Sequence, residues 1–310
     1  MNSSKIILTR ELPAAMCQAL NQFGTVSVWS DRTQPLSEGD ILVSTPMDPL
    51  SEQQLQLLPE SLRLIANIGV GTDHIDLAAA RARGISVSNT PVVTEDTADL
   101  TLTLMLAASR RLSRSEWHLR NNDWASGVSQ LGQRVHGKRL GIIGMGAIGQ
   151  AVARRAKGFD MEILYHGPRP KPEAEKQLGA RYFSDLKQML AQADIISLNC
   201  DLNAQTRHII NADTLAAMKP GAVLINTGRG PLVDEAALIL ALKNNHLGAV
   251  GLDVYEFEPD VSPQLLEFDN VTLSPHIGSA TQECRGDMAR RVCMNIAQFI
   301  QQGSALDSCN

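Results

Sequence analysis

The feature that most constrains the fold is a set of three glycines, Gly144, Gly146 and Gly149, spaced as G-x-G-x-x-G within KRLGIIGMGAIGQ. Apolar residues before them predict a buried parallel strand, and small residues after them predict a helix packed on that strand. The first glycine would allow a tight turn, the second would let a pyrophosphate approach the backbone, and the third would let the helix pack closely. Ordinary turns can also have this spacing, but between a strand and a helix it favours a dinucleotide site.

Short β-rich segments alternate with helical patterns on both sides of this motif. We predict strands at Lys5–Thr9, Val26–Trp29, Ile41–Ser44, Leu62–Ile68 and Ile85–Asn89, and then at Leu140–Gly144, Glu162–His166, Asp194–Cys200, Ala222–Thr227, Ala249–Val254 and Val271–Ser274. We predict helices at Pro13–Phe23, Ser51–Leu58, Ile75–Arg83, Thr94–Arg111 and Glu283–Gln301, and a loop with two tryptophans within residues 112–137. Such alternation is typical of parallel sheets flanked by helices.

This pattern predicts an α/β protein with two Rossmann-like domains. The first, flavodoxin-like and substrate-binding, would comprise residues 1–97 together with 281–310, because the last helix is long enough to return to it. The second, residues 98–280, would bind the dinucleotide. We expect the active site in the interdomain cleft, at the carboxyl ends of the strands.

The composition excludes several classes of partner. Of the 310 residues, 44% are hydrophobic and 20% are charged, and the net charge is -5 without a basic patch. Nucleic acid and anionic membranes are therefore not expected as partners. The N-terminus has no signal-peptide region and the most apolar helical stretch is too short to span a bilayer, so we expect a cytoplasmic protein. The five cysteines show no zinc spacing, so we expect reduced thiols and no metal.

The loop after the second strand of the predicted dinucleotide domain indicates which nicotinamide cofactor fits. A carboxylate at this place normally accepts a hydrogen bond from the ribose 2′-hydroxyl of NAD. Here the sequence reads YHGPRPK, and we expect cofactor contacts from His166, Pro168, Arg169 and Lys171. Arg169 and Lys171 could pair with a 2′-phosphate, so NADP(H) should be preferred and NAD(H) remains possible. The alternative is a solvated basic loop.

Three further segments each place ionisable residues just after a predicted strand. They are INTGRG with Arg229, GLDVYEFEP with Asp253 and Glu258, and SPHIGS with His276. Taken singly, Arg229 could be an ion-pair partner beside a helix, Glu258 a surface carboxylate and His276 a packed loop residue. Because all three segments follow strands of one sheet, we expect them to converge at its carboxyl edge.

These residue types suit the reduction of a 2-keto acid. A histidine titrates near neutral pH, so His276 would protonate the carbonyl oxygen in reduction and accept a proton in oxidation. Glu258 would keep the imidazole protonated and oriented. Arg229 would bind the substrate carboxylate and polarise the carbonyl. The hydride itself would come from a reduced nicotinamide.

The same segments resemble those of the D-isomer-specific 2-hydroxyacid dehydrogenases. GIIGMGAIG, INTGRGPLVDE, GLDVYEFEP and SPHIGSAT match the blocks of that family in order, and ANIGVGTDHIDL and SNTPVVTEDTADLTLTLMLAASRRL match it in the first half. The resemblance covers nearly the whole chain. Within the family, the basic loop and the SPHIGSAT block are most similar to glyoxylate and hydroxypyruvate reductases, which include 2-ketogluconate reductases.

The resemblance implies a homodimer and a defined set of binding residues. It assigns catalysis to Arg229, Glu258 and His276, with Arg229 and His276 also contacting the substrate. It assigns the substrate carboxylate to the backbone N–H groups of Val70 and Gly71, in a glycine-rich loop that can present such donors to an anion. Besides the three glycines, it implies cofactor contacts from Ala147, Ile148, Cys200, Thr227, Gly228, Asp253 and Gly278.

We therefore expect an NADPH-dependent reductase of small 2-keto acids such as glyoxylate and hydroxypyruvate. One alternative keeps the site and changes the substrate to a larger sugar acid such as 2-ketogluconate. Another is a nucleotide-sensing binding protein on the same scaffold, because a fold does not fix a function. Met47, after the third predicted strand, could face the substrate, but we expect a packed residue.

Overall fold

The computed structural model describes residues 4–310, which form two compact units. Unit 1 contains the chain up to Val93 together with Ala280–Asn310, and unit 2 contains Thr94–Ser279. Helix α4 (Thr94–Ser109) belongs entirely to unit 2, whereas a boundary at residue 97 would divide it. Within the described chain, no helix combines the length and apolarity needed to cross a membrane.

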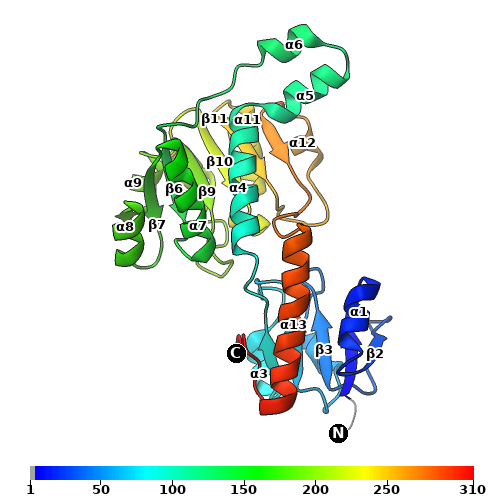
Figure 1. The fold of residues 1–310 in the computed structure, drawn as a ribbon. Coiled ribbons are helices and arrows are strands. Elements are labelled where there is room, and N and C mark those ends of the chain that lie inside the picture. The colour runs from blue at the N-terminus through cyan, green and yellow to red at the C-terminus, as the bar shows by residue number, and fades with distance from the viewer. Residues whose placement is uncertain (1–3) are drawn as a thin grey trace. The chain divides into compact units, whose positions relative to one another are not determined.

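Unit 1 is built on a parallel five-stranded sheet in the order β2-β1-β3-β4-β5 (Figure 1). Its strands are β1 (Ser4–Leu8), β2 (Gly24–Val28), β3 (Ile41–Ser44), β4 (Leu64–Asn67) and β5 (Ser86–Ser88). Its helices are α1 (Ala14–Leu20), α2 (Glu52–Gln56), α3 (Leu77–Ala82) and α13 (Gln282–Gln302). This strand order is flavodoxin-like.

Successive side chains of the unit 1 strands enter two different cores, because strand residues alternate between the faces of a sheet. Ile6 and Ile41 pack with Ile296 of α13 on one face. Ile7 and Leu42 pack on the other face, in the cluster that includes buried residues of α2 and α3. The last helix of the chain is therefore part of the core of unit 1.

Unit 2 is built on a parallel seven-stranded sheet within the described residues, in the order β12-β11-β10-β9-β6-β7-β8. Its strands are β6 (Arg139–Ile143), β7 (Glu162–His166), β8 (Arg181–Phe183), β9 (Ile195–Leu198), β10 (Ala222–Asn226), β11 (Leu247–Leu252) and β12 (Val271–Leu273). Starting from β6, this is the strand order of a dinucleotide-binding domain with one strand added. The expected α/β class with two parallel sheets is confirmed.

Helices cover both faces of the unit 2 sheet. Helix α4 and α7 (Ala147–Ala156) share a core with Ile142 and Ile225. The opposite core includes Leu198 and Leu224. The remaining helices of the unit are α5 (Leu112–Arg120), α6 (Trp124–Ser129), α8 (Pro172–Leu178), α9 (Leu186–Leu190), α10 (Ala212–Ala216), α11 (Glu235–Lys243) and α12 (Pro263–Leu266), with short 3-10 turns η1 (Lys157–Phe159) and η2 (Gly230–Leu232).

Several elements of unit 2, among them β8, α5 and α6, have no counterpart in the sequence predictions. The edge strand β8 was not predicted, because it has only three residues and an exposed first one, so it lacks an apolar run. The segment 112–137 was predicted as a loop but contains α5 and α6. These helices project from the rest of unit 2 (Figure 1), so they do not show the single buried face by which a helix is detected.

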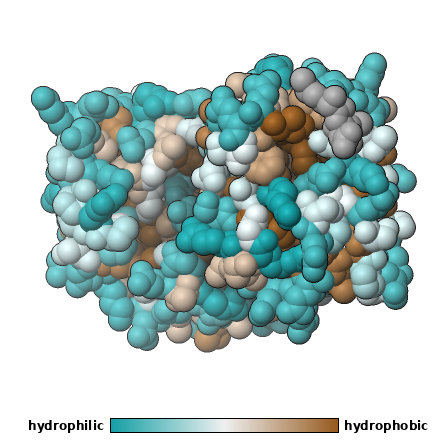
Figure 2. Space-filling view, turned by 90° about the horizontal axis from the view of Figure 1, so that it is seen from below, coloured by the Kyte–Doolittle hydropathy of each residue, from teal (hydrophilic) through white to brown (hydrophobic). Residues whose placement is uncertain are grey.

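The face of the molecule seen from below is mostly polar. Figure 2 shows a mostly hydrophilic face with hydrophobic patches scattered among polar side chains. Singly exposed apolar residues are normal on such surfaces.

Candidate functional site

Three neighbouring strands of unit 2 end in the segments that carry the predicted catalytic residues. Arg229 follows β10, Glu258 follows β11 and His276 follows β12. These strands are adjacent and parallel in the order β12-β11-β10. Their carboxyl ends therefore lie along one edge of the sheet, where open α/β sheets bind ligands.

His276 and Glu258 form a hydrogen-bonded pair. The Nδ1 atom of His276 lies 2.7 Å from Oε2 of Glu258, and Oε1 of Glu258 accepts a hydrogen bond of 3.0 Å from the Tyr255 amide. Burial raises the pKa of the Glu258 carboxyl, but the hydrogen bond from His276 and the positive charges of His276 and Arg229 lower it more, so that the net pKa lies below its usual value. The carboxylate therefore stays ionised and fixes the orientation of the imidazole.

Arg229 is held by the turn that follows β10. The side-chain amide of Asn226 donates to the Arg229 carbonyl at 2.9 Å and its oxygen accepts from the Gly228 amide at 3.0 Å. The Arg229 Nη1 donates to the Gly228 carbonyl at 2.9 Å. Because its charge acts on Glu258, the guanidinium belongs to the same electrostatic site as the His276–Glu258 pair.

Asp253 organises the backbone that carries His276. Its fully buried carboxylate accepts from the Ser274 hydroxyl at 2.6 Å and from the amides of Ile277 and Gly278, each at 2.8 Å. Burial raises the pKa of Asp253, and these three hydrogen bonds offset only part of that effect. The Asp253 carbonyl also accepts from the His276 amide at 2.8 Å. Asp253 thus fixes the turn from which the imidazole extends.

The glycine turn between β6 and α7 fits the pyrophosphate of a dinucleotide. A Cβ on Gly144, whose φ is +97°, would lie 2.5 Å from the Cys200 amide nitrogen, and one on Gly149 would lie 2.1 Å from the Gly144 carbonyl oxygen. A Cβ on Gly146 would meet nothing within 4 Å. The open space therefore lies at the second glycine of the motif, beside the free N–H groups of the helix start at Ala147 and Ile148.

Other residues predicted to contact the cofactor lie around this turn or on neighbouring strands. Cys200 packs against Gly144, and burial raises the pKa of its thiol to about 12, so the group is a neutral apolar wall at physiological pH. Thr227 is buried and shares a hydroxyl–hydroxyl hydrogen bond of 2.7 Å with Thr101. Gly278 accepts a hydrogen bond from Thr97 through its carbonyl at 3.3 Å.

In the basic loop after β7, the cationic side chain of Arg169 is exposed. Two tyrosines hold the loop: the hydroxyl of Tyr165 accepts from the Lys171 amide at 2.7 Å, and the hydroxyl of Tyr182 donates to the Gly167 carbonyl at 3.1 Å. His166 Nδ1 lies 3.0 Å from the Phe183 carbonyl oxygen of the edge strand. Pro168 and Arg169 are exposed, and within residues 4–310 the Arg169 guanidinium has no ion-pair partner.

In unit 1, the carbonyl groups of the loop predicted to bind the substrate carboxylate accept hydrogen bonds from asparagine side chains. Asn67, which is 1% exposed, donates to the carbonyls of Gly69 and Gly71 at 3.1 and 3.0 Å, and Asn89 donates to that of Val70 at 2.8 Å. Within residues 4–310, the amides of Val70 and Gly71 have no hydrogen-bond acceptor. A short run of free amide donors is the arrangement that binds an anion.

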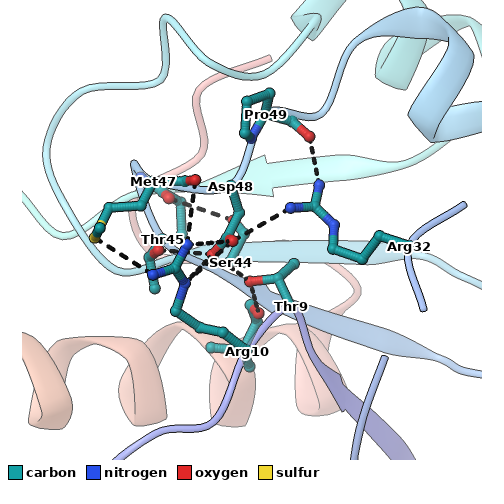
Figure 3. Close-up of polar contacts among 10 residues, drawn as sticks. Thr9, Arg10, Arg32, Ser44, Thr45, Met47, Asp48 and Pro49 are labelled. Carbon is teal, nitrogen blue, oxygen red and sulfur yellow. Dashed lines mark hydrogen bonds and ion pairs between the residues drawn. The ribbon is translucent and has the colours of Figure 1, made fainter. Parts of the chain in front are cut away.

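A buried carboxylate fixes the loop that follows β3 in the same unit. Figure 3 shows Arg10 and Arg32 approaching Asp48 from two sides. Asp48 accepts from Arg10 at 2.7 Å, from Arg32 at 3.2 Å and from the hydroxyls of Thr9 and Thr45, each at 2.7 Å. Although burial raises the pKa of Asp48, these hydrogen bonds lower it to about 2.

Met47 does not pack as the sequence had suggested. Its side chain is 69% exposed, with its sulfur 3.4 Å from Nη1 of Arg10. The prediction of a packed residue is wrong because the neighbouring Asp48, rather than Met47, is the side chain that the loop buries. This burial could not be predicted from the sequence, since an aspartate is seldom fully buried without partners and those partners, Arg10 and Arg32, come from distant parts of the chain.

The structure thus brings together, within unit 2, the three predicted catalytic side chains and the glycine turn on one sheet. The Val70–Gly71 loop belongs to unit 1. The sequence analysis did not identify the supporting residues Asn67, Asn226 and Tyr255. They lie within the recognised motifs, but their hydrogen-bond partners could not be predicted. The part of the chain that the structure describes contains no cluster of three or more His, Cys, Asp or Glu residues able to hold a metal ion.

Comparisons with known proteins match the chain over most of its length. Residues 102–278 match the family model of the D-isomer specific 2-hydroxyacid dehydrogenase, NAD binding domain. A glyoxylate reductase from Thermococcus litoralis is 41% identical over 95% of this chain and 93% of its own. The crystal structure of the NADPH-dependent glyoxylate/hydroxypyruvate reductase from Sinorhizobium meliloti in complex with NADP and malonate is similar with a TM-score of 0.93, at 34% identity, over 99% of this chain and 97% of that chain.

Proposed function

The chain belongs to the D-isomer-specific 2-hydroxyacid dehydrogenase family, and from that membership we propose that it is a glyoxylate/hydroxypyruvate reductase that converts small 2-keto acids into D-2-hydroxy acids. The relatives named as glyoxylate reductases support the substrate class. The single observation that supports the chemistry most directly is the 2.7 Å contact between Nδ1 of His276 and Oε2 of Glu258. The positive charge of Arg229 acts on the same carboxylate.

His276 is the proton donor in this proposal. Glu258 occupies Nδ1 of the ring, so Nε2 is the nitrogen that is left to protonate the carbonyl oxygen. The ionised Glu258 stabilises the imidazolium before the proton is transferred and keeps the ring in its orientation during the transfer. In the oxidation direction the neutral ring accepts the proton from the 2-hydroxyl group, as microscopic reversibility requires.

Arg229 and the amides of Val70 and Gly71 bind the substrate in this proposal. A guanidinium can hold a carboxylate through two parallel hydrogen bonds, and its charge also polarises the adjacent keto group. The amides of Val70 and Gly71, which have no acceptor within residues 4–310, provide further donors for the carboxylate. Together these contacts would orient a 2-keto acid whose remaining substituent is small.

A nicotinamide cofactor, held at the turn of Gly144, Gly146 and Gly149, supplies the hydride when bound. NADPH is the preferred form in this proposal. No carboxylate stands after β7 to meet a ribose 2′-hydroxyl, and the exposed Arg169 is placed to pair with a 2′-phosphate. The NADP complex of the Sinorhizobium meliloti reductase supports the same preference.

The active form in this proposal is a homodimer. The segment from α5 to the residues after α6 projects from unit 2 (Figure 1) and exposes six large apolar side chains. They are Leu112, Trp117, Leu119, Trp124, Val128 and Leu131, between 51% and 84% exposed. Large exposed apolar side chains gathered on one projecting segment are typical of an interaction site, and a second copy of the chain would bury them. All five cysteines are free thiols, which suits the reducing cytoplasm where we place the enzyme.

The test is a panel of 2-keto acids assayed with both reduced cofactors. We expect glyoxylate and hydroxypyruvate to be reduced with the highest kcat/KM, and 2-ketogluconate with a lower one. Arg169→Ala should raise the KM for NADPH by about tenfold, as expected for loss of one charge-assisted phosphate contact, and leave the KM for NADH unchanged. Equal effects on the two cofactors would contradict the phosphate contact. Binding of NADPH without reduction of any 2-keto acid would favour a nucleotide-sensing protein.

A further inference from the structure

Two buried glutamates outside the catalytic trio hydrogen-bond to each other's backbone. Glu235, the first residue of α11, is 7% exposed, and the side chain of Glu256, in the loop after β11, is 8% exposed. Oε2 of Glu256 accepts from the Glu235 amide at 3.2 Å, and Oε2 of Glu235 accepts from the Glu256 amide at 3.3 Å. We call these two residues the reciprocal glutamate pair.

The reciprocal glutamate pair joins the segment of Arg229 to the segment of Glu258. Arg229 precedes η2, which leads directly into the start of α11 at Glu235. Glu235 accepts a hydrogen bond from the Glu256 amide, two residues before Glu258. Ser262, on the other side of Glu258, acts on the same carboxylate through its backbone and partly offsets the rise in its pKa. The loop that carries the catalytic carboxylate is therefore anchored to the start of α11 at Glu256.

The two segments also touch through their backbones. A Cβ on Gly230 would lie 1.7 Å from the Tyr255 carbonyl oxygen and 2.5 Å from the Glu256 nitrogen, so only a glycine fits between them. Because Tyr255 donates its own amide to Glu258, any shift at this contact reaches the catalytic carboxylate directly. The arrangement of Arg229 relative to Glu258 is thus fixed by contacts away from the substrate.

The Arg207 guanidinium compensates the charge of one of these carboxylates, that of Glu256. Oε1 of Glu256 lies 2.6 Å from Nε2 of His208 and 3.1 Å from Nη2 of Arg207. Burial and the charge of Glu256 raise the pKa of Glu235. The His208 amide in turn donates to the Pro231 carbonyl at 2.9 Å, which ties this third segment to η2.

We propose that Glu235 and Glu256 are positioning residues that set the distance between Arg229 and the Glu258–His276 pair. The inference rests on the proposed function, because it concerns the placing of the substrate-binding and proton-donating groups of that reaction. Neither glutamate contacts the substrate. They keep the segments after β10 and β11 in a fixed position relative to each other when the substrate is absent.

The test compares Glu235→Ala with Asp234→Ala. The first removes the acceptor of the Glu256 amide. The second removes the N-cap of the same helix, where Asp234 accepts from the Ala237 amide at 3.0 Å. Misplacement of catalytic groups by a fraction of a side-chain length should lower kcat/KM for glyoxylate about ten- to a hundredfold in Glu235→Ala. Asp234→Ala should lower Tm but change kcat/KM by less than about twofold.

Two further measurements separate positioning from general destabilisation. Glu235→Gln keeps an oxygen that can accept from the Glu256 amide, so it should recover most of the kcat/KM that Glu235→Ala loses. Hydrogen–deuterium exchange should show faster exchange of the peptide covering residues 255–262 in Glu235→Ala but not in Asp234→Ala. This readout needs no turnover, so it tests the glutamate pair even if wild-type protein reduces no 2-keto acid, a result that would refute the proposed function instead.

The proposal is overturned by any of three outcomes. Glu235→Ala could retain wild-type kcat/KM while its 255–262 peptide exchanges faster, in which case the pair is structural only. The exchange rate could stay unchanged, in which case the pair does not hold the loop. Finally, Asp234→Ala could lose as much kcat/KM as Glu235→Ala, in which case stability of α11 alone explains the loss.

Discussion

His276 extends from a backbone conformation that most side chains avoid. Its φ of +52° lies in the left-handed region, where asparagine is tolerated better than alanine. His276→Asn should therefore keep the turn that Asp253 holds while removing the imidazole. We expect kcat for glyoxylate reduction to fall by about two orders of magnitude or more, the usual contribution of general acid catalysis. Steady-state kinetics with saturating NADPH would measure it.

His136→Asn is the matched control for that variant. The side chain of His136 is 62% exposed and lies 3.6 Å from that of Asp160 on the surface of unit 2. Its replacement should leave kcat within about twofold of wild type, because surface substitutions have small effects. A His276→Asn enzyme as fast as this control would show that another group donates the proton.

Two glycines of the dinucleotide turn should respond oppositely to the same added methyl group. Gly149→Ala would bring a Cβ within 2.1 Å of the Gly144 carbonyl oxygen, so it should destabilise unit 2 by about 1–3 kcal/mol, a typical overpacking cost. Gly146→Ala meets no protein atom within 4 Å and should leave the free energy of unfolding near that of wild type. It should instead raise the Kd for NADPH about tenfold or more, since the methyl group would fill the space expected for the pyrophosphate.

Calorimetry of both variants with and without NADPH checks this pair. A Gly146→Ala protein that is stable and binds NADPH as tightly as wild type would contradict the assignment of the turn as the pyrophosphate site.

At the residue scale, the sequence predicts which glycines and which ionisable residues meet at the sheet edge. It does not reveal the reciprocal glutamate pair, because Glu235 and Glu256 fall in motifs that already have another explanation and their contact depends on the fold of both loops.

Among the elements, the β3–α2 connection depends on a single carboxylate. Since the pKa of Asp48 is lowered from 3.8 to about 2, its ionised form contributes stability above pH 3.8 that is lost as the pH falls toward 2. The shift corresponds to about 2 kcal/mol. Asp48→Asn should therefore lower the free energy of unfolding of unit 1 by about that amount at neutral pH.

Urea unfolding followed from neutral pH into acid would test the effect. The difference between wild type and Asp48→Asn should shrink as Asp48 becomes protonated, and Glu38→Gln, at an exposed carboxylate, should show a much smaller difference at every pH. A difference that persists unchanged in acid would mean that the variant disturbs packing rather than charge.

Elements with continuous apolar runs were predicted well, and those without were not. β3 and β7 have the predicted bounds because their residues are almost all buried and polar residues or turns flank them. β8 is too short for an alternation to be recognised, and α5 and α6 expose their apolar residues instead of burying them. Hydrophobic patterns in a sequence indicate which residues are buried in the core of the chain itself. They therefore miss elements whose apolar residues are exposed.

At the scale of the whole molecule, the α5–α6 projection accounts for the proposed dimer. Placing two charges in its apolar surface with the double variant Trp124→Asp and Leu131→Asp should convert the dimer into a monomer, because burying unpaired carboxylates costs several kcal/mol. Light scattering coupled to gel filtration would give the mass. Leu266→Asp, at a residue that is 64% exposed on α12, should remain dimeric. A monomeric wild type would refute the dimer itself.

Unit 1 is assembled from two stretches of chain that the whole of unit 2 separates. Asn295 of α13 donates to the Asn89 carbonyl at 2.9 Å, and the Cys309 amide donates to that of Val87 at 2.8 Å, beside the last strand of the sheet. During synthesis on the ribosome, the β1–β5 segment must therefore wait for α13, with one apolar face covered only in part, by α1, while unit 2 emerges and folds. A nascent chain stalled before residue 280 should consequently recruit chaperones to its earliest part, although its middle is already native.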